Sequence, residues 1–413
     1  MRKVLMIANQ FPPMGGAGVQ RTSKFVKYLT QLGHEVAVIT KEVEGGLKDK
    51  TLNEDIPDSV KVYRLKVYDF TNGTGFLGLV KKVLSKLVSP DSEIFWAKKN
   101  EKEVLNLLDK ERPEILYTTS FPYSSHLLGL YIKKLRPDIK WIVDYRDEWT
   151  NNPFHLDSRL NRLKFKSEKK EELEINEACD FLIANTEIML ANFVKDTPSL
   201  EGRSTFIPNG YDESDFEGLD IKGSPEDTFV MTHTGSLYGR RNLDDVLEAI
   251  KLLLDRGEVE KEKIELRIVG NVYESVLDKY RQDYDLRDEI VSYGYLPHKK
   301  SIEMLFQSDA LLLLIGKGKG SGNFYTGKVF EYLRTYKPII GIVPDGVARD
   351  LIIDTGTGLT ADPGDIEGIA GLIKKFYGSK FSGEEVIEPV IDQIEKYRRE
   401  NQAKALSKII EEI

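Results

Sequence analysis

Short apolar runs alternate with longer helical patterns along most of the chain. The first run, Lys3–Ala8, leads through a glycine-rich turn into a helical pattern over Val19–Leu32. Gly33 ends that pattern and a second apolar run, Glu35–Thr40, follows it, so this region predicts a βαβ unit. Further strands are predicted at Val60–Leu65, Ile115–Thr118, Trp141–Val143, Phe181–Ala184 and Thr205–Ile207. Such alternation indicates a parallel sheet with helices on both faces.

A polar segment near the middle of the chain separates two such halves. Residues 216–228 are rich in charged residues, Gly, Ser and Pro, a composition typical of a linker. After it, strands are predicted at Phe229–His233, Ile264–Val269, Ile290–Ser292, Ala310–Leu314 and Pro338–Ile342.

The length of the chain, 413 residues, exceeds what a single core usually supports. We therefore predict two doubly wound α/β domains with parallel sheets, at residues 1–217 and 218–388. The charged, helical segment 389–413 is predicted to pack back across the hinge. Because open α/β sheets bind ligands at the carboxyl ends of their strands, both crevices are expected to open on one cleft.

The stretch 320–333, Gly-Ser-Gly-Asn-Phe-Tyr-Thr-Gly-Lys-Val-Phe-Glu-Tyr-Leu, is the most informative part of the sequence. It follows a predicted strand and enters a helix, with Thr326 as the expected N-cap. A helix start offers free backbone N–H groups to a phosphate, and Glu331, one turn deeper, can accept hydrogen bonds from the vicinal hydroxyls of a ribose. This pairing predicts a nucleotide site; an ordinary helix start with a solvated Glu331 is the alternative.

Two other turns bear on phosphate binding. Gly15 and Gly16 lie in the loop after the first strand, but a dinucleotide fingerprint fits poorly because Arg21 stands at its third glycine. In the turn that starts at Gly235, the adjacent Arg240 and Arg241 can clamp a diphosphate through bidentate contacts. The alternative for this second turn is a solvated basic loop.

Polar residues also close the strand Trp141–Val143. Asp144, Arg146 and Asp147 follow it in the sequence Asp-Tyr-Arg-Asp-Glu-Trp, where they can form a polar site or a structural Arg–Asp ion pair. His126 falls on a predicted helix, where a packed or a surface histidine is the alternative to a ligand contact. No nucleophile elbow, zinc-protease motif or Walker loop is present, so hydrolase, zinc and P-loop interpretations have no support.

Composition and charge narrow the function classes. One cysteine, Cys179, excludes a disulfide framework, and the five histidines lack metal-ligand spacing. Residues 1–200 carry 31 Lys and Arg against 28 Asp and Glu, and the remainder carries 28 against 39. The acidic second half argues against a nucleic-acid binder. No run of 18 apolar residues occurs, and the chain enters a strand almost at once, which predicts neither a membrane span nor a cleaved signal but a cytoplasmic protein.

Together these residues resemble glycosyltransferase family 4, the retaining enzymes of the GT-B fold, which pairs two Rossmann-like domains across a cleft. The matching segments are Phe-Pro-Pro-Met-Gly-Gly-Ala-Gly at 11–18, Pro-Asn-Gly-Tyr-Asp at 208–212, the turn 235–241 and Lys-Val-Phe-Glu-Tyr-Leu at 328–333. They span nearly the whole chain. The segment 144–149 is similar to a subgroup that builds envelope polysaccharides.

The resemblance implies transfer of a sugar from a UDP- or GDP-linked donor to a saccharide or lipid-linked acceptor, with retained anomeric configuration and with no metal or other cofactor. It implies donor contacts by Gly16, Gly235, Arg240, Arg241, Asn323, Thr326, Gly327, Lys328 and Glu331. The implied acceptor side consists of Gly15, Gly16, His126, Asp144, Arg146 and Asp147, and the implied catalytic groups are Asp147, Arg240 and Arg241.

Two alternatives stay open, and a departure from the family pattern at Asn323 motivates the first of them. Asn323 stands eight residues before Glu331, where the family carries its first glutamate, the contact to the donor sugar. An uncharged amide there is compatible with a catalytically weak sugar-nucleotide-binding subunit. An epimerase of the same fold, acting on a nucleotide sugar without an acceptor, is the other alternative.

A further prediction concerns the segment Gly75–Val88. Its apolar residues recur at helical spacing, and Lys81, Lys82 and Lys86 occupy the remaining arc. Such a basic amphipathic helix can lie on an anionic membrane surface, where three lysines give weak, reversible binding. This predicts a peripheral location on the inner face of the membrane; a helix packed on the sheet is the alternative.

Overall fold

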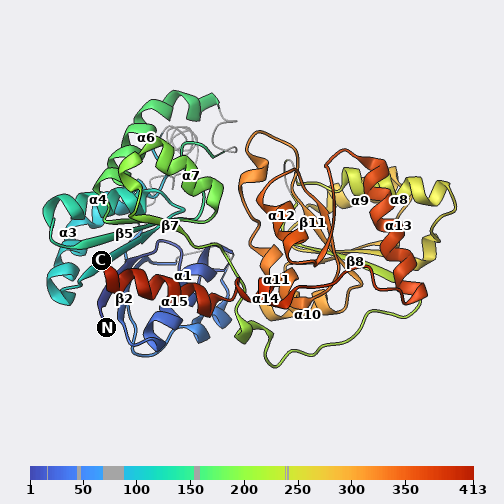
Figure 1. Cartoon of the computed structure of the whole chain (residues 1–413), viewed down its shortest axis with the longest axis horizontal. Helices are drawn as coiled ribbons and strands as arrows, with labels where there is room; N and C mark the ends of the chain where they lie inside the picture. The colour runs from blue at the N-terminus through green and yellow to red at the C-terminus, as the bar shows by residue number, and fades with distance from the viewer. Residues whose placement is uncertain (16, 44–47, 68–87, 153–158, 238, 240) are drawn as a thin grey trace, which may run out of the picture. The chain divides into compact units, whose positions relative to one another are not determined.

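The computed structural model divides into two compact units (Figure 1). Unit 1 comprises Met1–Asn209 and Arg399–Ile413, and unit 2 comprises Gly210–Arg398. The structure describes all residues except 16, 44–47, 68–87, 153–158, 238 and 240. Gly16, Arg240 and nearly all of the predicted amphipathic segment Gly75–Val88 therefore lie outside the described residues.

Unit 1 is built on a seven-stranded parallel sheet in the order β3-β2-β1-β4-β5-β6-β7. The strands are β1 (Lys3–Ile7), β2 (Glu35–Lys41), β3 (Lys61–Leu65), β4 (Ile115–Thr119), β5 (Lys140–Tyr145), β6 (Phe181–Ala184) and β7 (Ser204–Phe206). The central strands are apolar on both faces because helices cover both sides. The strand order reverses between β1 and β4, which makes the loops after these two strands the expected place for a ligand.

Two apolar layers flank this sheet. The helices of unit 1 are α1 (Ala17–Gln31), α3 (Ile94–Glu111), α4 (Ser124–Leu135), α6 (Arg159–Ala178), α7 (Glu187–Asp196) and α15 (Arg399–Glu412), with short 3-10 turns η1 (Lys50–Asp55) and η2 (Pro198–Leu200). Helices α3, α4, α6 and α7 contribute to one layer, and α1 and α15 contribute to the other. Apolar residues of α15, among them Leu406 and Ile410, join Phe25 and Leu29 of α1, so the end of the chain completes the core of unit 1.

Unit 2 is built on a six-stranded parallel sheet in the order β10-β9-β8-β11-β12-β13. Its strands are β8 (Phe229–Thr234), β9 (Ile264–Val269), β10 (Ile290–Gly294), β11 (Ala310–Leu314), β12 (Ile339–Ile342) and β13 (Gly358–Ala361). Its helices are α8 (Asp244–Asp255), α9 (Glu274–Asp283), α10 (His298–Phe306), α11 (Lys328–Thr335), α12 (Val347–Asp354), α13 (Ile366–Ser382) and α14 (Ile391–Glu395), with η3 (Glu213–Phe216), η4 (Lys261–Lys263) and η5 (Ser321–Asn323). Here the order reverses between β8 and β11.

The predicted strands are confirmed, most of them to within one or two residues at each end. β13 was not predicted, because Gly-Leu-Thr-Ala has neither an apolar run nor alternation. The predicted N-cap at Thr326 is wrong. Helix α11 begins at Lys328 after Gly327, which has helical backbone angles, and the carbonyl of Thr326 accepts from the N–H of Val329. Since the turn is closed by this backbone bond, the hydroxyl of Thr326 caps nothing. No helix in the described part of the chain is long and apolar enough to cross a bilayer.

Candidate active site

The start of α11 lies beside the strand-order reversal of unit 2. Lys328 is the first residue of this helix, and its ammonium group donates to the carbonyl of Thr234, the last residue of β8. The Tyr332 hydroxyl accepts from the backbone N–H of Thr234 at 2.9 Å, so the next turn of α11 is tied to the same strand end. Helix α11 is therefore held with its first turn at the carboxyl end of β8.

His233 supports Lys328 from within the sheet. Its Nδ1 lies 3.0 Å from the carbonyl oxygen of Leu312, which can only accept, so Nδ1 carries the proton and Nε2 is an acceptor. Lys328 Nζ lies 3.2 Å from that Nε2. Burial and the nearby charge of Arg241 lower the pKa of Lys328 well below its usual range, against the opposing effect of Glu331. Burial likewise lowers the pKa of His233, which favours its neutral form.

Glycines at the strand ends make room for this lysine. Gly235 has a φ of +102°, and a Cβ built there would lie 2.6 Å from Lys328 Nζ. Gly270, at the end of β9, has a φ of +155°, and a Cβ there would lie 2.4 Å from the carbonyl oxygen of Gly235. Only glycine fits these two positions without a shift of the backbone or of Lys328.

Two further glycines, Gly322 and Gly346, approach each other closely and hold the loop after β11 in place. A Cβ at Gly322 would lie 2.1 Å from the carbonyl oxygen of Asp345, and one at Gly346 would lie 2.2 Å from that of Gly322. Asn323 is the next residue and is half-buried. Thr326 is buried, its hydroxyl has no hydrogen-bond partner among the residues that the structure describes, and Gly327 is exposed.

Glu331 completes the first turn of α11 and is half-buried. Its Oε1 lies 2.8 Å from Nε2 of His298, the first residue of α10. The arrangement thus offers a lysine and an exposed helix start, suited to an anion, and a carboxylate one turn along, suited to hydroxyl groups. The structure brings Gly235, Arg241, Lys328 and Glu331 together around this helix start.

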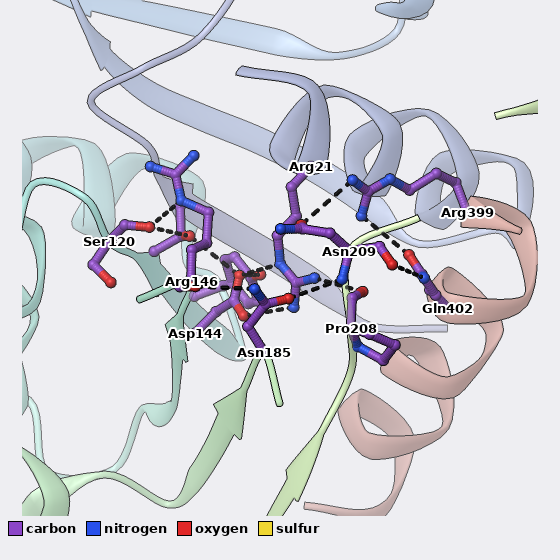
Figure 2. Close-up of polar contacts among 11 residues, drawn as sticks. Arg21, Ser120, Asp144, Arg146, Asn185, Pro208, Asn209, Arg399 and Gln402 are labelled. Carbon is purple, nitrogen blue, oxygen red and sulfur yellow. Dashed lines mark hydrogen bonds and ion pairs between the residues drawn. The ribbon is translucent and has the colours of Figure 1, made fainter. Parts of the chain in front are cut away.

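In unit 1, Arg146 connects backbone segments at the carboxyl ends of the strands. Its guanidinium donates to the backbone carbonyls of Gly18, Ser120 and Phe121, the last at 2.6 Å. Its own carbonyl accepts from Asn185 Nδ2 at 3.1 Å, and Figure 2 shows Arg146 between Ser120 and Asn185. Arg146 is buried, with its donors directed at backbone oxygens. It therefore holds the start of α1 and the loop after β4 against the loop after β5.

Asp144 and Arg21 form a buried ion pair (Figure 2). Arg21 Nε and Nη2 lie 2.9 and 2.8 Å from the two carboxylate oxygens, and Tyr117 and Thr119 donate to the same carboxylate. Burial alone would raise the pKa of Asp144, but the charge and hydrogen bonds of Arg21 outweigh burial and lower it. The expected contact of Asp144 with an acceptor is corrected accordingly: its side chain is fully buried, and the ion-pair alternative describes it.

His126 is also corrected to a packed residue. It is fully buried, its Nδ1 lies 2.8 Å from Thr118 Oγ1, and its ring centroid is 4.5 Å from that of Tyr145. Burial lowers the pKa of His126 to about 3, so the ring is neutral. By contrast, Asp147 is exposed and Gly15 is half-buried, so both can meet a ligand.

The chain passes into unit 2 next to the ion pair. Arg21 Nη1 donates to the carbonyl of Pro208 at 3.0 Å, and Asn209 N donates to Asn185 Oδ1 at 2.8 Å (Figure 2). Gln402 of α15 donates to the carbonyl of Asn209 at 3.0 Å. These bonds attach the last residues of unit 1 to its core.

Two family models match the chain. The model described as Glycosyltransferase Family 4 matches residues 14–215, and the model described as Glycosyl transferases group 1 matches residues 217–388. The chain belongs to the family 4 glycosyltransferases. A search of curated proteins gives no match.

Solved structures show the fold of this glycosyltransferase. Sucrose-phosphate synthase from Thermosynechococcus elongatus is similar over 100% of this chain and 98% of its own, with a TM-score of 0.66 and 13% identity. Anabaena HepE, solved in complex with UDP-glucose, is similar over 100% of both chains, with a TM-score of 0.64 and 14% identity. A UDP-GlcNAc 2-epimerase from Methanocaldococcus jannaschii matches 99% of both chains with a lower TM-score, 0.54, and 13% identity. The two parallel-sheet units thus form a GT-B fold.

Sequence reasoning about this glycosyltransferase missed His233, His298 and Arg21. Each has a polar side chain at the carboxyl end of a strand or on the element that follows it, which was the available signal. Their partners are 33 or more residues away in the sequence, so no local spacing indicated the contacts.

In the part of the chain that the structure describes, no three His, Cys, Asp or Glu side chains are grouped to hold a metal ion.

Proposed function

We propose that the protein transfers a sugar from a UDP- or GDP-linked donor to a saccharide or lipid-linked acceptor, with retention of anomeric configuration, in the synthesis of cell-envelope polysaccharide. One observation carries the proposal: Lys328 and Glu331 lie one turn apart on α11, beside the glycine-lined end of β8. A nucleoside diphosphate needs an anion site for its diphosphate and, one helical turn away, an acceptor for the hydroxyls of its ribose. The UDP-glucose complex of the similarly folded HepE supports a nucleotide sugar as donor.

The donor is assigned to unit 2. Lys328, Arg241 and the N–H groups that follow Gly327 bind the diphosphate, and Arg240, outside the described residues, is assigned with them. Glu331 accepts hydrogen bonds from the ribose, and Asn323 contacts the donor sugar. Gly235 keeps the loop after β8 close to the phosphates, and Thr326 offers its hydroxyl at the helix start.

During the reaction, negative charge develops on the leaving diphosphate. Preorganised cations and backbone N–H groups stabilise such charge most effectively. Arg241, the start of α11 and Lys328 supply this stabilisation without a metal ion. The negative charge of the bound diphosphate favours the ammonium form of Lys328 against the effect of burial. An oxygen of the leaving phosphate accepts the proton of the acceptor hydroxyl.

The acceptor is assigned to unit 1. Asp147 is exposed on the loop after β5, where it orients the acceptor or a sugar hydroxyl. Arg146 belongs to the acceptor side as well, because its guanidinium fixes the backbone that carries Asp147. Gly15 and Gly16 let the loop after β1 approach the acceptor closely.

A panel of nucleotide sugars with and without candidate acceptors tests the proposal. We expect slow release of UDP or GDP from one donor, accelerated by the correct acceptor, with the anomeric proton of the product showing retention by NMR. Formation of an isomeric nucleotide sugar without acceptor would support the epimerase alternative, whose fold this chain shares. Nucleotide binding with no turnover of any donor would support the binding-subunit alternative raised by Asn323.

We also propose a cytoplasmic location with weak contact to the inner face of the membrane through Gly75–Val88. A lipid-linked acceptor would account for such contact. Sedimentation with anionic and neutral liposomes at low and high salt tests it. Binding restricted to anionic liposomes at low salt supports the proposal, and equal recovery in the supernatant under all conditions contradicts it.

A further inference from the structure

His298 and Glu331 face each other at the start of two helices. His298 opens α10, Glu331 lies in the first turn of α11, and His298 Nε2 is 2.8 Å from Glu331 Oε1. The exposed fractions of the two side chains are 15% and 18%, so both are largely enclosed but reachable by solvent. Because a carboxylate only accepts, His298 Nε2 carries the proton of this bond.

This bond restricts the carboxylate. A glutamate has three rotatable side-chain bonds, and an unheld carboxylate would sample several orientations at the helix start. A donor on Oε1 selects one of them and leaves Oε2, together with the second lone pair of Oε1, for other donors. Two vicinal hydroxyls need acceptors in a fixed relative orientation, so a held carboxylate binds a diol better than a mobile one.

Two other charged residues of α10, Lys300 and Glu303, are engaged elsewhere. Lys300 Nζ lies 2.6 Å from Glu303 Oε2, and Glu303 Oε1 accepts from the backbone N–H of Asp220 at 3.3 Å. Lys300 is exposed and lies on the same helix as His298, two residues along. It therefore offers a matched control position that shares the helix but not the contact with Glu331.

We propose that His298 is a positioning residue that holds Glu331 for the ribose, and that this pair makes the site discriminate ribonucleoside from 2′-deoxyribonucleoside diphosphates. The proposal rests on the proposed function, since it assumes a nucleotide at α11. The substrate class follows from the chemistry of the pair, which recognises a vicinal diol rather than a phosphate or a base.

Replacing His298 with glutamine or with asparagine distinguishes a hydrogen bond to Glu331 from simple packing. The amide nitrogen of glutamine reaches about as far from the backbone as histidine Nε2, whereas that of asparagine stops near the position of Nδ1. His298→Gln therefore retains a donor to Glu331, and His298→Asn loses it while keeping the same amide group on a side chain one methylene shorter. His298→Ala, Glu331→Gln and Lys300→Ala complete the set.

Calorimetric titration with UDP, 2′-deoxy-UDP, GDP and 2′-deoxy-GDP gives the readout, the ratio of deoxy to ribo dissociation constants. We expect this ratio to fall about three- to tenfold in His298→Asn and His298→Ala, mainly through weaker binding of the ribonucleotide. His298→Gln should keep most of the ratio, Lys300→Ala all of it, and Glu331→Gln should lose it. Circular dichroism melts confirm that each variant is folded.

The outcomes separate this inference from the proposed function. If wild type binds neither UDP nor GDP, the proposed function fails and the inference with it. If wild type prefers the ribonucleotide and Glu331→Gln removes the preference, but His298→Asn keeps it, the nucleotide site stands and the role of His298 is wrong. Equal ratios in His298→Gln and His298→Asn, both lower than in wild type, would also overturn the proposed role.

Discussion

A Cβ at position 235 would lie 2.6 Å from the ammonium nitrogen of Lys328, so any side chain at residue 235 would force this lysine to shift from its observed position. The two residues are far apart in the sequence, yet the end of β8 and the start of α11 fix them side by side. Lys328 reaches the carbonyl of Thr234 through this space. The residue type at position 235 therefore determines where the ammonium group of Lys328 can lie.

The first prediction is that Gly235→Ala weakens binding of a nucleoside diphosphate more than binding of the nucleoside. Displacing Lys328 removes a charge-assisted contact, worth about tenfold or more in affinity for UDP or GDP. Backbone strain at positive φ costs roughly 1–3 kcal/mol of stability in addition.

Gly257→Ala is the matched control for this prediction. Gly257 is in unit 2 with a φ of +66°, and a Cβ there meets no atom within 4 Å. It places alanine at a positive φ without the clash with Lys328, so calorimetry should show unchanged affinity for the diphosphate. Equal losses of affinity in the two variants would show that strain, and not Lys328, is responsible.

The second prediction concerns the buried pair of Asp144 and Arg21. Asp144→Asn leaves the guanidinium of Arg21 buried without a full counter-charge, which should cost roughly 3–5 kcal/mol of unfolding free energy. The double variant Arg21→Met, Asp144→Leu removes both charges and should be less destabilised than Asp144→Asn.

Tryptophan fluorescence in urea measures this effect on unit 1 alone. The three tryptophans, Trp96, Trp141 and Trp149, all belong to unit 1 and are buried there. A stability of Asp144→Asn within about 1 kcal/mol of wild type, the size of an exposed pair, would contradict a structural role for the ion pair.

The third prediction is a loss of stability in acid through Glu111. Hydrogen bonds from Tyr63, Lys61 and Lys3, opposed by burial, lower the pKa of this carboxyl from 4.5 to about 2. Because the folded pKa lies below the unfolded value, the contribution is complete above pH 4.5 and disappears as the pH falls through 2. It should amount to roughly 1–3 kcal/mol at neutral pH.

Glu111→Gln should therefore flatten the pH dependence of unit 1 stability across this window. Asp109→Asn on the same helix is the control, because Asp109 is exposed and pairs with a surface residue, Arg136. Urea midpoints by tryptophan fluorescence between neutral pH and pH 3 give the comparison. Parallel curves for wild type and Glu111→Gln would refute the assignment.

Much of the fold could be predicted because the strands are apolar runs bounded by turns. Ile264–Val269 and Ala310–Leu314 were placed correctly since parallel strands are buried on both faces. β13 lacks that signal, and it exists only because β12 offers a partner. Thr326 failed as a cap because the backbone closed the turn in its place.

The candidate site was less predictable than the fold. Motif position indicated Lys328 and Glu331, but which polar groups touch depends on packing between distant segments. Asp144 could not be assigned to Arg21, 123 residues away, from local spacing, and His126 could not be told from a ligand contact before its burial was known.

The fourth prediction is that Asn323→Glu changes the preference for the donor sugar. Asn323 follows Gly322, whose close approach to Gly346 and Asp345 holds the loop after β11. A carboxylate accepts hydrogen bonds but cannot donate them, unlike the amide. Rates of donor hydrolysis over a panel of nucleotide sugars should shift in rank, with affinity for UDP or GDP unchanged. An identical rank order in the two proteins would show that residue 323 does not touch the sugar.

The central claim is a nucleotide site at the start of α11, and calorimetric titration of wild type and Glu331→Ala with UDP and GDP tests it most directly. We predict that wild type binds one of the two nucleotides and that Glu331→Ala loses roughly 1.5–3 kcal/mol of binding free energy, the range for hydrogen bonds to a charged group. No binding of either nucleotide by wild type, or the same affinity in Glu331→Ala, would contradict the account.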